Sequence, residues 1–554
     1  MDTLAPRQIT LSTVSLFSGI GGIDLGLEQA RHKTVEMCEI WEPARRVLTQ
    51  HFEGVLIAKD VRTYTPEMEY DLLAAGFPCV DLSHAGAQRG ILGPGSGLVK
   101  HVFRIAKSTQ PEWILLENVP NLLRLQRGAG IEYIIDSLVE LGYAWAYRVV
   151  DSRFSGVPQR RNRVIILASR STDPGPTLLA VDATSNDDAV QGGADEVMSG
   201  FYWTEGRRGT GFVLGSMPTL KGGSTLGIPS APAIWRPQSE LGQRIVLPTI
   251  ADGEELQGFD RGWTDAARVS DERDHRWKLI GNAVTVGVAE WIGRRLSQSD
   301  NHKWELPSPL IPLDRTKPWP NAAWGSGSNA WKSSASCWPE IQHGKTLNEV
   351  VGDKISTPLS YRATKGFLSR LEESGLNVDR RLFDDLQSHL AVMRDESSLK
   401  EKELRETSEA SRTGKNTGNQ HIQNAKSAKA KPEVILRRTL TSLGLRYRLQ
   451  RYVESDLPWR SDIVFMAAKV IVDVRGCCGQ VCANRVSEPK INHGQIENSH
   501  ARHQERDSRM VKELAARGWL VIVVWEHEDA ESAAKYIEAA VKERRLRAER
   551  RQTA

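Results

Sequence analysis

The sequence predicts a two-part α/β protein, in which a large parallel sheet covered by helices is followed by a smaller α/β unit. Short apolar runs typical of strands alternate with helix-like stretches from about residue 13 to residue 297. A polar stretch near 397–431 then separates this pattern from a second, compact one of helix, two strands, helix and strand. A chain of 554 residues is long enough for two or three domains.

Shifts in composition give the domain boundaries. Residues 1–300 carry the alternating pattern, which an irregular insert rich in Gly, Ser, Thr and Pro interrupts at about 171–243. Residues 301–396 begin with a Pro- and Trp-rich stretch, which we expect to be extended and to run over the surface, and continue as helix. Residues 397–430 are typical of a flexible linker, and 431–545 form the last domain.

Composition excludes several classes of protein. The N-terminus lacks a basic segment followed by an apolar run, and no apolar stretch reaches roughly 18 residues, so we expect neither a secretory signal nor a membrane span. Six scattered cysteines fit a reducing cytosol better than a disulfide framework. The net charge of +4 says little about nucleic acid, and basic runs such as QRRNR and VKERRLRAERRQTA are either solvated faces or DNA contacts.

A Gly-rich turn opens the first domain. LFSGIGGIDLGLEQA starts as a strand and continues as an amphipathic helix, so its glycines either let a ligand approach the backbone or form a plain tight turn. The next strand ends in CEIWEP, where Glu39 can bind ribose hydroxyls and Trp41 can stack on an adenine. Asp60 is a further acid at a strand end.

Two later strands end in residues that can carry out chemistry. Cys79 follows a proline directly after the strand DLLAAG, and a polar, Gly-rich loop comes next. Taken alone, such a cysteine is more often inert packing. Glu117 and Asn118 end the strand WILL, and a carboxyl group with a raised pKa can manage protons for a thiolate nucleophile. Because the carboxyl ends of parallel strands meet at one edge of a sheet, we expect Cys79 and Glu117 to lie close together.

The ordered motifs FSGIGG, GFPC, ENV, GVPQRRNR, LQGF and GNAV resemble the DNA cytosine-5 methyltransferase family over roughly the first 300 residues. The resemblance implies a Rossmann-like, S-adenosylmethionine-dependent fold whose small target-recognition domain is the insert. It implies that the nucleophile Cys79 attacks C6 of a cytosine flipped out of duplex DNA, and that Glu117 hydrogen-bonds the ring nitrogen. In the matching QxRxR pattern, which begins at Gln159, Arg161 and Arg163 orient the catalytic loop and the base. The implied cofactor residues are Phe17, Gly19, Gly21, Glu39, Trp41, Asp60, Asn282 and Val284. Val80 stands where the family often has Gln.

The last domain resembles the very-short-patch repair endonucleases, which nick DNA beside T:G mismatches, and so implies a restriction-endonuclease-like fold. Asp462 matches that family's metal-binding aspartate, and we interpret it as a vestigial magnesium site. Gly476-Cys477-Cys478-Gly479-Gln480 replaces the family's aromatic pair and histidine, so we expect DNA binding without nicking. Cys477, Cys482 and His527 are candidate zinc ligands, the alternative being cysteines packed without metal.

The sequence therefore predicts a cytoplasmic, nucleoid-associated bacterial enzyme that methylates C5 of cytosine in a specific sequence of double-stranded DNA. We expect a monomer, with a cognate restriction endonuclease as a possible partner. Three alternatives stay open: a bifunctional enzyme that also nicks T:G mismatches, an RNA cytosine methyltransferase, and a DNA-binding protein without activity.

Overall fold

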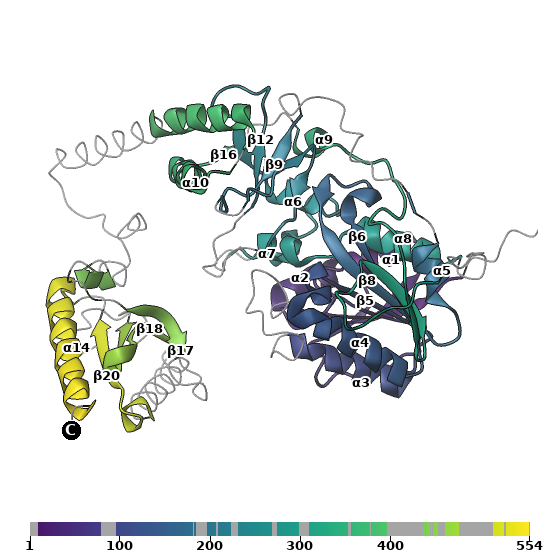
Figure 1. The fold of residues 1–554 in the computed structure, drawn as a ribbon, viewed down its shortest axis with the longest axis horizontal. Helices are drawn as coiled ribbons and strands as arrows, with labels where there is room; N and C mark the ends of the chain where they lie inside the picture. The colour runs from purple at the N-terminus through teal and green to yellow at the C-terminus, as the bar shows by residue number, and fades with distance from the viewer. Residues whose placement is uncertain are drawn as a thin grey trace, which may run out of the picture. The chain divides into compact units, whose positions relative to one another are not determined.

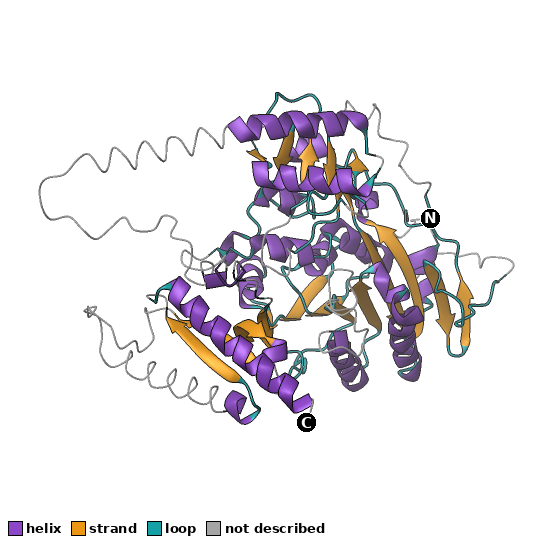
Figure 2. Ribbon diagram, turned by 60° about the vertical axis from the view of Figure 1, so that its left-hand side comes forward, coloured by secondary structure: helices purple, strands orange, loops and turns teal. Residues whose placement is uncertain are grey.

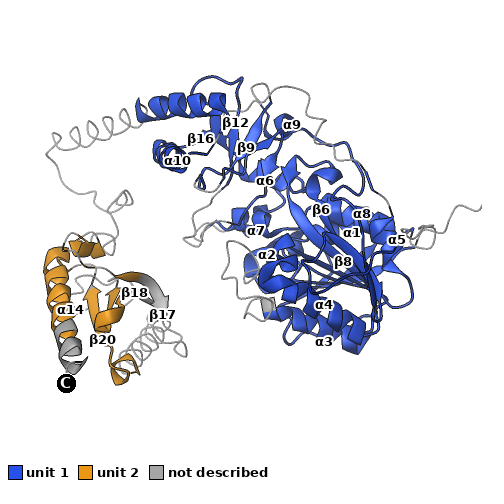
Figure 3. Ribbon diagram, in the orientation of Figure 1, with its two compact units in different colours: residues 1–414 blue, residues 415–554 orange. Residues whose placement is uncertain are grey.

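The structure is a computed structural model. Between residues 9 and 395 it describes everything except 79–95, 181, 184–196, 207–208, 223–230, 269–273, 299–309, 353–355 and 377. Beyond residue 395 it describes 436–452 apart from 438, 442, 444 and 446, and then 460–475, 513–525 and 528–552. The chain divides into two compact units, Met1–Gly414 and Lys415–Ala554 (Figure 3).

A nine-stranded sheet forms the centre of the first unit. Its strands run in the order β15-β14-β6-β8-β5-β4-β1-β2-β3. Their bounds are β1 Ser12–Leu16, β2 Lys33–Cys38, β3 Leu56–Ala58, β4 Leu72–Ala75, β5 Trp113–Asn118, β6 Ala144–Asp151, β8 Asn162–Ser169, β14 Ala322–Ser326 and β15 Asn329–Lys332. The runs TVSLF, DLLAAG, EWILLEN and RVIILAS are all strands of this sheet, as the apolar pattern predicts.

The sheet is mixed rather than wholly parallel. Strands β1 to β5 pair in parallel, but β8 runs antiparallel to both β5 and β6. The expectation of a parallel sheet is therefore correct only for its five first strands. The reversal follows from the connection between β6 and β8, because a short link returns the chain antiparallel beside the strand it has just left, whereas a parallel return needs a long crossover.

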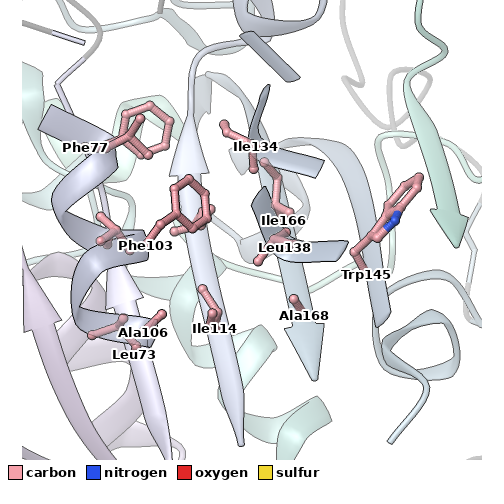
Figure 4. Close-up of a cluster of buried hydrophobic side chains, with 14 of the residues drawn as sticks. Leu73, Phe77, Phe103, Ala106, Ile114, Ile134, Leu138, Trp145, Ile166 and Ala168 are labelled. Atoms are coloured by element: carbon pink, nitrogen blue, oxygen red, sulfur yellow. The ribbon is translucent and has the colours of Figure 1, made fainter. Parts of the chain in front are cut away.

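Helices cover both faces of this sheet (Figure 1). On one face α3 (Val99–Thr109) and α4 (Ala129–Glu140) pack onto a cluster that includes Leu73, Ile114 and Ile166 (Figure 4). On the other face α1 (Gly22–Gln29), α5 (Pro174–Leu179) and α8 (Val286–Leu296) pack onto a second cluster. Helix α2 (Glu42–His51) lies against a third, smaller cluster. Burial on both faces explains why the central strands are apolar along their whole length.

The Pro- and Trp-rich stretch differs from its expected form. It contains the hairpin β14–β15, and β14 pairs antiparallel with β6. Trp319, Trp324 and Trp338 are buried rather than spread over the surface, because Trp319 belongs to the core cluster on one face of the sheet and the other two belong to the cluster on the opposite face.

A smaller, five-stranded sheet lies beside the large one in the first unit, in the order β10-β9-β12-β13-β16. Its strands are β9 Ser199–Phe201, β10 Val213–Leu214, β12 Ala233–Trp235, β13 Ile245–Leu247 and β16 Thr357–Pro358. The helices around it are α6 Ile250–Glu255, α7 Arg276–Asn282, α9 Leu347–Val351, α10 Tyr361–Ser374 and a helix at 380–395. Figure 2 shows α10 and the helix at 380–395 alongside this sheet. A two-stranded sheet, β7 (Gln159–Arg160) with β11 (Met217–Pro218), joins the insert to the QRRNR motif.

Short 3-10 helices occur in several connections. They are η1 Ser96–Leu98, η2 Pro120–Leu123, η3 Leu125–Gly128, η4 Ser152–Ser155, η6 Asp265–Ala267 and, in the second unit, η8 Met466–Ala468.

The second unit has a four-stranded sheet, in the order β17-β18-β19-β20, and a long C-terminal helix. The bounds are β17 Arg448–Tyr452, β18 Arg460–Phe465, β19 Val470–Arg475, β20 Leu520–Trp525 and α14 Ala530–Gln552. Its core includes Leu436, Ile463, Val472 and Ile537. The predicted strands SDIVF, KVIVDVRG and WLVIVVW are confirmed, whereas β17 was not anticipated. Among the described residues, no helix combines the length and apolar character needed to cross a membrane.

Candidate active site

The carboxyl edge of β5 carries an ion pair. Arg163 Nε lies 2.8 Å from Glu117 Oε1, and both side chains are nearly buried, at 12% and 11% exposed. A Cβ placed on Gly76 would lie 3.6 Å from Glu117 Oε2 and 3.7 Å from a methyl group of Val284. Three sequence motifs, GFPC, ENV and GNAV, therefore meet at Glu117.

Asn118 ties the GFP turn to the same edge. Its Nδ2 donates to the carbonyl of Phe77 at 3.1 Å, and its Oδ1 accepts from the amide of Val119 at 2.8 Å. Cys79, the predicted nucleophile, lies outside the described residues, one position beyond Pro78. Phe77, two positions before Cys79, is held at the carboxyl edge of the sheet.

The Gly-rich turn adopts left-handed backbone at three of its residues: φ is 56° at Phe17, 59° at Gly19 and 83° at Gly21. A non-glycine residue rarely takes such a φ, and backbone strain of this kind is common at functional sites. A Cβ on Gly21 would lie 2.4 Å from the Phe52 ring, whereas a Cβ on Gly19 would meet no atom nearer than 4.0 Å. The space beside Gly19 is therefore open, as a ligand that approaches the backbone requires.

Glu39 holds this turn against the end of β2. Its Oε2 accepts from the amide of Gly19 at 2.9 Å, and its Oε1 accepts from the amide of Trp41 at 2.7 Å. Burial raises the pKa of the Glu39 carboxyl, and these two amide bonds counter the rise. A carboxylate has about four acceptor sites, so Glu39 can also receive ribose hydroxyls.

The indole of Trp41 lies among residues just before and within α7. Lys278 Nζ lies 4.5 Å from the ring centroid, and the His275 ring meets the indole edge at 5.3 Å. Asp60 instead makes a local ion pair with Arg62, whose Nε donates at 2.9 Å. The hydrogen bonds from Arg62 lower the pKa of Asp60 to about 2. Asp60 is therefore an anion that is paired with Arg62.

Arg161 differs from Arg163, although two positions separate them. Arg161 is 1% exposed, and its guanidinium donates to the carbonyls of Leu220, Gly281 and Ala283 at 3.2, 3.2 and 2.6 Å. It therefore fastens the insert to the GNAV motif and does not face Glu117 as Arg163 does. We assign Arg161 a positioning role.

A buried polar network around Arg161 was not anticipated. Gln257, in LQGF, donates to the carbonyl of Ile280 and accepts from the hydroxyl of Thr285. Gln159 donates to the carbonyl of Leu256 and accepts from the amide of Leu220. The only signal in the sequence was that polar residues fall inside otherwise apolar motifs. Asn282 lies beside the insert, since a Cβ on Gly222 would meet its Oδ1 at 2.8 Å.

In the second unit, Asp462 lies on β18 and accepts from the amide of Val474 at 2.9 Å. One position beyond the Ile463–Val472 pair, the antiparallel register sets Asp462 opposite Asp473, which the sequence reasoning overlooked. The candidate zinc ligands Cys477, Cys482 and His527 lie outside the described residues. Within the described part of the chain, no three His, Cys, Asp or Glu side chains gather as a metal site.

Comparisons with known proteins find matches for both units. The family model of the C-5 cytosine-specific DNA methylases matches residues 11–191, and that of the DNA mismatch endonuclease Vsr matches residues 412–482. Type II methyltransferase M2.BsuMI of Bacillus subtilis (strain 168) is 43% identical over 369 residues, which cover 65% of this chain and 93% of that protein. The chain belongs to the C-5 cytosine-specific DNA methylases.

This methylase has further relatives. Type II methyltransferase M.BsuFI of Bacillus subtilis is 37% identical over 166 residues, or 29% of this chain and 40% of that protein. Among solved structures, the Entamoeba histolytica methyltransferase EhMeth is 15% identical, with a TM-score of 0.39, over 53% of this chain and 99% of that one. The matches support a DNA (cytosine-5-)-methyltransferase of the restriction-modification type, for which S-adenosylmethionine is the expected cofactor and DNA the expected substrate.

Proposed function

We propose that this methylase modifies C5 of cytosine within a specific sequence of duplex DNA, through a covalent adduct between Cys79 and C6 of a flipped base. The observation that carries the proposal is the Glu117–Arg163 ion pair, at the edge where the GFP turn ends. A base flipped out at this edge would meet a carboxyl group whose position an arginine fixes.

The chemistry follows from what these residues can do. S-adenosylmethionine supplies an electrophilic methyl group on a sulfonium sulfur. Addition of the Cys79 thiolate to C6 gives C5 enamine character, and the Glu117 carboxyl favours that addition by hydrogen-bonding the ring nitrogen. Once C5 has taken the methyl group, with the electron pair of the broken bond left on sulfur, loss of the C5 proton restores the ring double bond as the thiolate leaves C6. Gly19, Glu39, Trp41, Asp60, Asn282 and Val284 are the residues that would hold the cofactor.

Bisulfite sequencing of DNA from a cell that expresses the chain tests this proposal. We expect methylated cytosines at one short sequence, and none after Cys79→Ala, because the variant lacks the thiolate that adds to C6. Cys38→Ala is the matched control: burial raises the pKa of that thiol to about 12, so it stays protonated and inert. Methylation that survives Cys79→Ala would contradict the mechanism, and unmethylated DNA from the unchanged chain would contradict the function.

For the C-terminal unit we propose DNA binding without nicking, because GCCGQ lacks both the aromatic wedge and a general base. Asp473 opposite Asp462 favours a second candidate, a methylase that also nicks T:G mismatches, since two neighbouring carboxylates suit a divalent cation.

A further inference from the structure

We propose that residues 347–395, which follow the GNAV motif, form half of the DNA-recognition domain, and that Arg370 positions the turn through which this domain contacts duplex DNA. We call residues 197–247 together with 347–395 the recognition module. The inference rests on the proposed function and adds to it which residues determine specificity. Motif order alone would confine recognition to the insert at about 171–243.

The two halves of the recognition module share one sheet. Strand β16, from the second half, pairs antiparallel with β13, from the first, and so extends the smaller sheet by a strand. They also share one core: Phe201, Trp235 and Ile245 of the insert pack against Phe367 and Leu386. The rings of Phe201 and Phe367 stack with centroids 5.3 Å apart. An apolar core that needs both halves indicates one folding unit.

A buried acid joins the halves more specifically. Asp385 is 4% exposed, and its Oδ2 accepts from Trp235 Nε1 at 2.9 Å. Its other oxygen pairs with Arg244 at 2.5 Å. Farther along, Arg236 donates to the hydroxyl of Ser356 at 2.9 Å. Since a buried charge without partners is costly, removal of either half would leave the other with unsatisfied groups.

Arg370, on α10, shapes the turn after β9. Its Nε donates to the carbonyl of Glu205 and its terminal nitrogen to the carbonyl of Trp203, both at 2.7 Å. Gly206 has φ of 121°, and a Cβ there would lie 3.2 Å from the Cβ of Arg370. Contacts with α10, which lies about 160 residues later in the sequence, therefore fix the path of the main chain at 203–206.

The same turn contacts the catalytic side of the unit through Lys221. Lys221 makes an ion pair with Glu205 and lies 3.7 Å from the ring centroid of Tyr202. A Cβ on Gly281 would lie 2.4 Å from the amide nitrogen of Gly222, so this loop packs directly on the GNAV motif.

Two cations outside the turn supply positive charge. Lys221 keeps 41% of its side chain exposed although it pairs with Glu205, and the exposed Arg160 donates to the carbonyl of Gly211. Exposed cations beside an active site that acts on DNA suit contacts to phosphates, which fix the register of a protein on the duplex.

The relative M2.BsuMI supports the extent of the recognition module. Its match covers 65% of this chain, more than the first 300 residues, which hold all the catalytic motifs. Part of the segment beyond GNAV is therefore shared with a methyltransferase.

The test is Arg370→Gln in the full chain, with Arg362→Gln, exposed on the same helix, as the matched control. The substrates are a duplex with the sequence that bisulfite sequencing identifies and duplexes that differ from it by one base pair. Because two hydrogen bonds that fix the turn are lost, we expect KM for DNA to rise about tenfold, with kcat changed less than about twofold. We also expect the preference for the recognised duplex to fall. Arg362→Gln should match the unchanged chain in all three measurements.

Thermal melting and Arg370→Lys separate positioning from folding. The lysine keeps a charged donor for one carbonyl, so its KM should lie between those of the unchanged chain and the Gln variant. Equal KM and equal preference in Arg370→Gln would overturn the inference, as would a loss of kcat and melting temperature with KM unchanged. If the unchanged chain methylates no DNA, the proposed function fails and the inference fails with it.

Discussion

At the carboxyl end of β5, Glu117 is held by a guanidinium from β8, whereas on β18 Asp462 is held by a main-chain amide from the next strand. The first arrangement depends on the identity of two side chains that lie 46 positions apart, whereas the contact with the Val474 amide follows from the antiparallel register of β18 and β19. A carboxylate in contact with a buried guanidinium is held in one orientation, which a group that must meet a substrate requires. A carboxylate that is held by a main-chain amide can be retained after the catalytic function that it served has been lost.

Glu117→Gln tests the first edge and should have the largest effect. We expect kcat to fall by about 10²–10⁴, since an amide cannot take the proton role of a carboxyl group. Single-turnover methylation measures this. Glu112→Gln, at the opposite end of β5, is the control and should leave kcat unchanged. An equal loss in both variants would show that damage to the strand, rather than lost chemistry, is responsible.

Arg161→Met and Arg163→Met test whether the two arginines of one motif serve different purposes. Arg161→Met removes three hydrogen bonds to buried carbonyls, so we expect the free energy of unfolding to fall by about 2–4 kcal/mol. Arg163→Met should lower kcat and change stability less. Denaturant unfolding and methylation kinetics, measured on both variants, check this. The reverse pattern would exchange the roles that we assign.

Asp24 is a third acid, and no ion pair is recorded for it among the described residues. It is completely buried on α1, and its carboxyl group accepts from the hydroxyls of Ser15 and Thr34 and from its own main-chain amide. Burial raises the pKa of Asp24 from 3.8 to about 7. The folded state therefore binds more protons than the unfolded state between these values, and its stability falls as the pH rises through this window.

Asp24→Asn should consequently raise the free energy of unfolding at pH 8, by roughly 2–4 kcal/mol, and change it little below the unfolded pKa. Urea unfolding at the two pH values measures the difference. Glu132→Gln, exposed on α4, serves as the control for loss of one charge. A gain in stability of the same size at both pH values would refute the titration.

Asp462→Asn should have the smallest effect, namely none on the chemistry of either unit. We expect no nicking of a T:G duplex by the unchanged chain with magnesium, and full methylation by the variant. A gel assay on labelled duplex detects nicks. An Asp462-dependent nick would establish the bifunctional enzyme and would assign a role to Asp473.

Sequence reasoning located the strands that position the site because each is a short apolar run with a distinctive end. It did not find the hairpin β14–β15 or the place of β16, since pairing between distant segments leaves no local periodicity. It assigned the same role to Arg161 and Arg163, because a motif gives the spacing of residues along the chain but not the direction in which each side chain points. Arg161 lies between β7 and β8, whereas Arg163 lies on β8. Since residues two apart on a regular strand share a face, the sequence carried no local signal that would have separated their environments.

The glycines of the first helix have a consequence for how the chain can change. A Cβ on Gly22 would lie 2.2 Å from the carbonyl oxygen of Val284, and one on Gly26 would lie 2.4 Å from that of Val286. The N-terminal motif and the GNAV segment can therefore approach this closely only because Gly22 and Gly26 have no side chains. A substitution at either glycine would therefore require the main chain some 260 positions later to move at the same time. A single substitution cannot make both changes. We therefore expect changes in the Gly-rich N-terminal motif to be tolerated only together with changes in the GNAV motif.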